Sequence, residues 1–115
     1  MTINNLFEIA FVLQKMVDQT AQNKVPATIS YKIFHLTEEV NAALTVPNAV
    51  VAKLKETYGF ETENFDEAGF IKESNELAFT EIEQKISKLP YSYLEHFYLS
   101  VPEINALSPI IEETK

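Results

Sequence analysis

Residues 29–58, ISYKIFHLTEEVNAALTVPNAVVAKLKETY, carry the longest periodic pattern in the chain. Positions separated by alternating steps of four and three residues form a mostly apolar series, which is the spacing of one face of an α-helix. The series consists of Ile29, Ile33, Leu36, Val40, Ala43, Pro47, Val50, Leu54 and Thr57. The stretch predicts a long second helix. Gly59 is expected to end it, because glycine readily takes the left-handed backbone that follows a helix.

Pro47 leaves two interpretations of this stretch open. A proline inside a helix removes one backbone hydrogen bond and costs about 3 kcal/mol. The stretch can be one helix over about 29–58 that is kinked near Ala43, or two helices with Thr45 capping the second. The unbroken phase of the apolar series favours the kinked helix. Its buried residues are expected to include Ile33, Leu36, Val40 and Leu54.

The segment before it, residues 4–22, predicts a first helix. Its apolar residues again recur at helical spacing, and Asn5 followed by Glu8 resembles a capping box at the start. The apolar stripe consists of Leu6, Ile9, Ala10, Leu13, Met16 and Val17. The polar run at 19–24 and the following Pro26 are expected to close this helix.

A third helix is expected after an acidic loop at residues 61–67. Asn64 or Asp66 can cap it, and its apolar residues are Phe70, Ile71, Leu77 and Ala78. Residues 80–90 fit either more helix or a short strand that exposes Glu81, Glu83 and Lys85 on one face. Periodicity alone leaves both possibilities open.

The C-terminal part combines an aromatic run with a clear helix start. Aromatic residues favour a pleated surface, so a short strand is expected near His96–Leu99. Ser100 and Glu103 form a capping box for a last helix, with a proline in its first turn. Pro109 is expected to kink or split that helix.

Together these elements predict a mainly α fold, with an α+β fold as the alternative. We expect one compact helical domain over residues 1–115, built from three to five helices with the long kinked second helix. At most a small two-stranded β element is expected, near residues 80–99. With 115 residues, of which 46% are hydrophobic, the chain can bury one core.

Charge is unevenly distributed along the chain. Residues 1–60 contain five lysines and five acidic residues, whereas residues 61–115 contain four lysines and twelve acidic residues, which places the whole net charge of −8 in the second part. The chain has no arginine. Because phosphate and base recognition rely heavily on arginine, and a negative chain repels a polyanion, no nucleic-acid binding is expected.

The sequence contains no recognisable catalytic or metal-binding motif. It has no cysteine, only two glycines and two isolated histidines, His35 and His96. The acidic loop with Glu61 and Glu63 does not match an EF-hand, since Phe65 stands where an oxygen ligand belongs. We therefore expect no enzyme activity, no metal, no cofactor and no small-molecule substrate.

The aromatic run offers a candidate surface for a protein partner. Tyrosine-rich patches favour protein contacts because a rigid ring buries much area at a small entropic cost. The candidate surface comprises Tyr91, Tyr93, Phe97 and Tyr98, with Glu81, Glu83 and Glu95 as an acidic rim. The alternative is that these rings fill the core. Self-association, if present, is expected through the neutral half, residues 1–60, which also should form most of the core.

The first 20 residues lack a basic region, and charged residues interrupt their apolar stretch, so neither a signal peptide nor a membrane span is expected. A cytoplasmic location follows as an expectation.

The order of these elements is similar to that of small uncharacterised proteins of tailed bacteriophages and prophages. The matching residues run from Lys55 to Gly59, from Phe70 to Leu77, and then through Glu81-Ile82-Glu83, Leu89-Pro90, Leu94, Leu99 to Ile104, Leu107 and Ile110-Ile111. The resemblance spans about residues 28–112. It implies a helical domain with a minor pair of strands and a viral origin, in the host cytoplasm or the virion, and it brings no known activity.

Three functions are compatible with these features. The first is a non-catalytic phage protein that acts through protein contacts, as a head or tail component of the virion or as an assembly accessory. The second is an acidic inhibitor of a host protein, either an anti-defence protein or a nucleic-acid mimic. The concentration of negative charge in residues 61–115 suggests it. A small enzyme is the least favoured, for want of a site.

Overall fold

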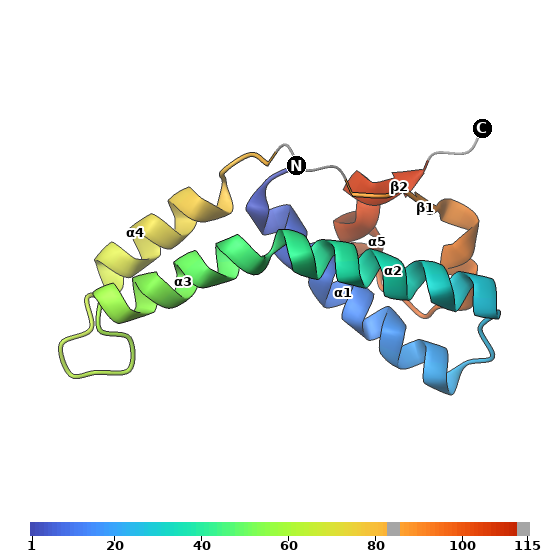
Figure 1. Cartoon of the computed structure of the whole chain (residues 1–115), viewed down its shortest axis with the longest axis horizontal. Helices are drawn as coiled ribbons and strands as arrows, with labels where there is room; N and C mark the ends of the chain where they lie inside the picture. The colour runs from blue at the N-terminus through green and yellow to red at the C-terminus, as the bar shows by residue number, and fades with distance from the viewer. Residues whose placement is uncertain (83–85, 113–115) are drawn as a thin grey trace.

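The computed structural model describes residues 1–82 and 86–112. Its helices are α1 (Ile3–Gln22), α2 (Ala27–Ala43), α3 (Thr45–Thr57), α4 (Glu67–Ala78) and α5 (Val101–Leu107), with short 3-10 helices η1 (Tyr91–His96) and η2 (Ser108–Ile110). Strands β1 (Leu89–Pro90) and β2 (Ile111–Glu112) pair in parallel (Figure 1). The expected mainly α fold with a small two-stranded β element is confirmed.

The core forms where α1 packs against α2 and α5. In the apolar stripe of α1, Leu6, Ile9, Leu13 and Met16 are completely buried, while Ala10 and Val17 are partly buried. From α2 it meets Ile33, Leu36 and Val40, which are also inaccessible to solvent. Among the described residues, 11 of the 17 buried hydrophobic side chains lie within residues 1–60, so the expectation that the neutral half forms most of the core is confirmed.

The first helix begins one residue earlier than expected and has a different cap. The Asn5 backbone N–H donates to the Thr2 hydroxyl at 3.2 Å, and the Asn5 side-chain oxygen accepts from the Thr2 backbone N–H at 2.8 Å. Asn5 thus occupies the third helical position of a capping box that starts at Thr2. The predicted Asn5–Glu8 box is wrong.

The predicted long second helix bends at the expected place but is divided there into α2 and α3. Only Leu44 separates the two helices, and no wide loop is present. Pro47 cannot donate the hydrogen bond that the Ala43 carbonyl would receive, which explains a break at this point. The alternative cap is absent, because the Thr45 hydroxyl donates back to the Asn41 carbonyl at 3.3 Å.

α3 and α4 form a helical hairpin that we name the α3–α4 arm, residues 45–79. Its turn starts at Gly59, whose φ is +71°. The backbone N–H of Phe60 donates to the Lys55 carbonyl, and that of Gly59 to the Glu56 carbonyl, the two bonds of a Schellman motif. The predicted roles of Gly59 as helix terminator and of Asp66 as the cap of α4 are confirmed.

The arm projects from the body, as Figure 1 shows. The radius of gyration is 16.4 Å, compared with about 13 Å for a compact domain of similar length. No residue of α4 is buried, and in α3 only Pro47 is. Leu54 was expected to be buried but is partly exposed, because α3 has left the body by that point and can pack only against α4.

The C-terminal part differs from the sequence-based expectation. The strand expected near His96–Leu99 is absent, and Tyr91–His96 is a 3-10 helix whose Leu94 and the following Phe97 point into the core. Their spacing of three residues matches the three-residue turn of such a helix. The strand partner of β1 is β2, outside residues 80–99.

The predictions for residues 80–90 and for Pro109 have different outcomes. Within residues 80–90, the described positions are not helical, and Glu81 forms an antiparallel bridge with Thr2. Glu83 and Lys85 lie outside the described residues. Pro109 does split the last helix, into α5 and η2.

Replacing Leu36 by alanine should lower the free energy of unfolding by about 2–5 kcal/mol, because it leaves a cavity in a fully buried site. Leu54→Ala serves as the control and should cost less, since its side chain is partly exposed. Urea unfolding followed by circular dichroism measures both. Equal losses for the two variants would contradict the placement of the core.

Candidate protein-binding site

The structure divides the predicted aromatic surface between core and solvent. Phe97 is only 7% exposed and belongs to the core, and Tyr93 is partly buried against it. Tyr91 and Tyr98 point outward, with 79% of Tyr98 exposed. Both readings of the aromatic run thus hold for part of it: two rings pack inside, and two are free for contacts.

The predicted acidic rim does not surround these rings. Glu81 pairs with the N-terminal ammonium at 3.0 Å, at the start of α1. The Tyr98 backbone N–H donates to Gln19 Oε1 at 2.7 Å, at the end of the same helix. Seventeen residues of helix separate Thr2 from Gln19, about 25 Å at the usual rise. Glu95 is exposed near Tyr98, whereas Glu83 lies outside the described residues, so no single surface unites the predicted set.

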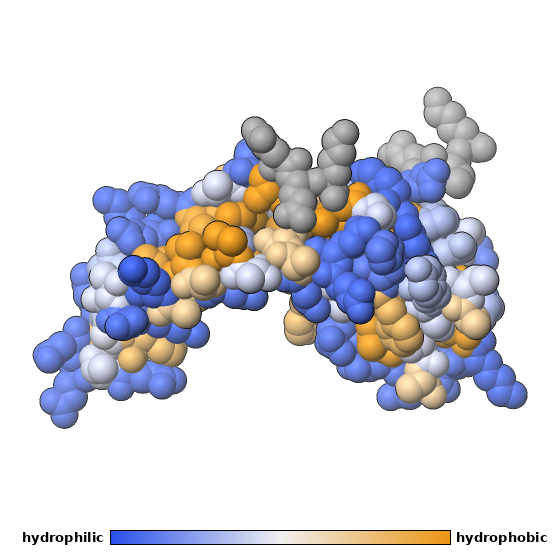
Figure 2. All heavy atoms as spheres, viewed as in Figure 1, coloured by the Kyte–Doolittle hydropathy of each residue, from blue (hydrophilic) through white to orange (hydrophobic). Residues whose placement is uncertain are grey.

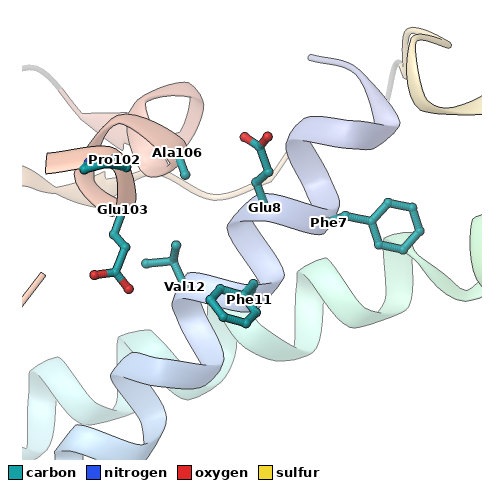
Figure 3. A pocket seen from close by; sticks show the side chains of 7 residues that line it. All are labelled: Phe7, Glu8, Phe11, Val12, Pro102, Glu103 and Ala106. Atoms are coloured by element: carbon teal, nitrogen blue, oxygen red, sulfur yellow. The ribbon is translucent and has the colours of Figure 1, made fainter. Parts of the chain in front are cut away.

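A groove between α1 and α5 is a more contiguous apolar surface (Figure 3). This α1–α5 groove has a volume of about 440 Å³. It is lined by Phe7, Glu8, Phe11 and Val12 from α1, and by Pro102, Glu103 and Ala106 from α5. Phe11 is 73% exposed, so its ring presents an open apolar edge of the groove.

Polar contacts fix the position of α5 beside α1. Ser100 caps α5 in a capping box with Glu103, which confirms the predicted start of this helix. The Glu103 carboxylate also pairs with Lys15 of α1 at 2.8 Å. This pair crosses from one helix to the other and links α5 to α1.

The two carboxylates of the groove differ in their electrostatic surroundings. The hydrogen bond from Lys15, supported by hydrogen bonds from Ser100, lowers the pKa of Glu103 to about 2. Its charge is therefore matched within the protein. Glu8 receives a hydrogen bond from the Asn4 amide at 3.2 Å, and in residues 1–82 and 86–112 it takes part in no ion pair. Glu8 is the charge of the groove that remains available to a ligand.

A second surface with exposed apolar residues lies on α3. Pro47, Val51, Leu54 and Tyr58 are buried or partly buried at the spacing of one helix face. The adjacent flank of the helix carries exposed residues that we name the α3 outer stripe: Val46, Ala49, Val50 and Lys53. Figure 2 shows hydrophobic residues gathered on the α3–α4 arm.

His35 and Glu39 of α2 take part in structural contacts. His35 pairs with Glu39 at 3.0 Å, one turn further along α2. Glu39 also accepts hydrogen bonds from the backbone and hydroxyl of Ser87 at 2.9 and 2.7 Å. Desolvation raises the pKa of Glu39, but the Ser87 bonds and the nearby positive charges outweigh it and hold the pKa below its ordinary value. Within the described ranges, no three His, Asp or Glu side chains converge as a metal site.

The α1–α5 groove was not predicted. Phe7 and Phe11 stand four residues apart on α1, outside its main stripe, and this pair was the one local signal available. Its other wall, Pro102 and Ala106, is about 90 residues away in sequence, so only the folded arrangement reveals the groove.

Comparison with known proteins gives no guide to this surface. No protein-family model matches the chain, and neither the curated proteins nor the solved structures gave a match. In the part of the chain described, no helix combines the length and apolarity needed to cross a bilayer.

The Glu103 contacts predict a pH dependence of stability. They favour the charged carboxylate, so their stabilisation is present above the ordinary pKa near 4.5 and is lost as the pH falls toward about 2. Glu103→Gln keeps a capping side chain but has no charge to lose. Between those two pH values, its melting temperature should fall less steeply than that of the wild type. Exposed Glu95→Gln should follow the wild type, and identical slopes for all three proteins would contradict the role of the Lys15 pair.

Proposed function

We propose that this protein is a non-catalytic protein-binding protein whose α3–α4 arm engages a protein partner. The observation that carries the proposal is the exposure of apolar residues on a hairpin that extends away from the core. The exposed set on the arm consists of Val46, Val50, Phe60, Ile71 and Phe79. Such surfaces on a small domain are typical of interaction sites.

Energetics also support a partner for the arm. Isolated helices of 12–15 residues are marginal in water, and most helices gain their stability from packing an apolar face. α3 and α4 have 13 and 12 residues, and Pro47 is the one buried residue of the two helices. The loop rings of Phe60 and Phe65 cluster with Phe70 of α4, with ring centroids 5.4–5.8 Å apart. A partner that covers the exposed residues would add the missing burial.

The resemblance to tailed-phage proteins supports a role as a virion component or assembly accessory, where an extended arm can bridge neighbouring subunits. The charge of the arm supports the second candidate, an acidic inhibitor. Residues 45–79 contain seven acidic residues and three lysines, a net charge of −4. An acidic arm would be attracted to a basic site on a host protein.

Site-specific photo-crosslinking tests the proposal. A diazirine amino acid at Val46 on the arm is compared with one at Tyr31 on α2, since both side chains are 71% exposed. In cells of the native source, irradiation should join the Val46 variant to a discrete protein and leave the Tyr31 variant largely free. Equal adducts at both positions, or none at either, would contradict arm-mediated binding.

A further inference from the structure

We propose that the partner of the arm is a second copy of this chain, with the α3 outer stripe of one copy seated in the α1–α5 groove of the next. The inference rests on the proposed function of the arm and names the partner it binds. Two unpartnered apolar surfaces, one concave and one helical, lie on different parts of the same molecule.

The spacing of the α3 outer stripe matches what a helix-binding groove requires. Val46, Ala49, Val50 and Lys53 occupy positions i, i+3, i+4 and i+7, the pattern of helices that dock in grooves. The small side chains Ala49 and Val50 allow a close approach to a shallow floor. In the groove they meet the exposed ring of Phe11 and the partly buried Ala106, whereas Val12 beneath them is buried in the core.

Charge complementarity sets the orientation of the docked helix. Lys53 is in no ion pair within residues 1–82 and 86–112, and Glu8 is the groove carboxylate without a cation. Lys53 follows Val50 by three residues of α3, and Glu8 precedes the exposed Phe11 by three residues of α1, about 4.5 Å in each case. An antiparallel arrangement therefore places Lys53 opposite Glu8 when Val50 rests on Phe11.

The electrostatic balance favours the neutral half for such a contact. α1 and α3 lie within residues 1–60, whose lysines and acidic residues balance, whereas the whole chain carries −8. The other wall of the groove, on α5, adds Glu103, whose charge is matched by Lys15. Repulsion between copies is screened over about 8 Å at physiological ionic strength.

A contact between two different surfaces is heterologous, so each copy keeps a free groove and a free stripe. Such contacts generate rings when the rotation closes and open chains when it does not. One helix face covers less than the roughly 800 Å² per partner of a standard interface, so the association should be weak and visible at high concentration. This mode suits a protein that assembles only where it is concentrated.

A charge-swap experiment tests the pairing. Glu8→Lys and Lys53→Glu, each alone, should weaken self-association about tenfold or more, as expected for reversing a close interfacial pair. Mixed in equal amounts, the two variants should associate again, because each groove then meets an oppositely charged stripe. Sedimentation velocity up to about 1 mM measures this weak association. Glu38→Lys and Lys24→Glu, at exposed sites, are the matched controls and should behave as the wild type.

The outcomes separate this inference from the proposed function. Thermal unfolding of each single variant verifies folding, and recovery in the mixture excludes a folding defect. Wild type that remains monomeric throughout, or single variants that associate like the controls, overturns the pairing. An adduct at Val46 with a different protein overturns it too but leaves arm-mediated binding intact. The absence of any Val46 adduct, together with a monomeric wild type, overturns both.

Discussion

The packing of α1 against α2 and α5 determines where every other part of the chain can lie. Burial of a large aliphatic side chain contributes about 1.5–3 kcal/mol, and α1 buries Leu6, Ile9, Val12, Leu13 and Met16 along one stripe. Polar contacts then fasten distant segments to the same helix. They are the bridge from Thr2 to Glu81 at its start, the pair of Lys15 with Glu103 in its middle, and the hydrogen bonds of Gln19 with Tyr98 at its end.

The projection of the arm follows from the same packing of α1 against α2 and α5. α2 remains on α1 as far as Val40 and Leu44, where the core ends. Pro47 then interrupts the helical hydrogen bonds, and α3 continues away from the body with only α4 beside it. The chain thus divides into a body with a complete core and a hairpin with an incomplete one. The groove beside α1 and the stripe on α3 are the apolar surfaces that this division leaves uncovered.

Local signals made much of this fold predictable. Helical periodicity identified α1 and the stretch that forms α2 and α3. Gly59 marked the end of α3, and Asp66 and Ser100 marked the starts of α4 and α5, through preferences that act within a few residues. The bend at Leu44 could be placed because a proline disturbs the carbonyl four residues before it.

Features that depend on distant residues were missed. The residues around Leu89 and Ile111 carry no local sequence signal for a parallel strand pair. The register of this pair is set by how α5 and η2 return to the body. Leu54 carries the same helical signal as Leu36, yet only the direction of α3 decides that it is partly exposed. The aromatic run favoured a strand by composition, whereas the core contacts of Leu94 and Phe97 select a 3-10 turn. The groove needs α1 and α5 together, so no single segment encodes it.

The division into a complete body and an incompletely packed arm is the central claim, and native-state hydrogen exchange tests it most directly. In dilute solution, amides of α1 and α2 should exchange only through global unfolding, whereas amides of α3 and α4 should exchange through a local opening of lower free energy. Because the arm lacks a buried core, its opening free energy should be clearly separated from that of Leu13 or Leu36. Equal protection of the arm and the body in the monomer would contradict the account.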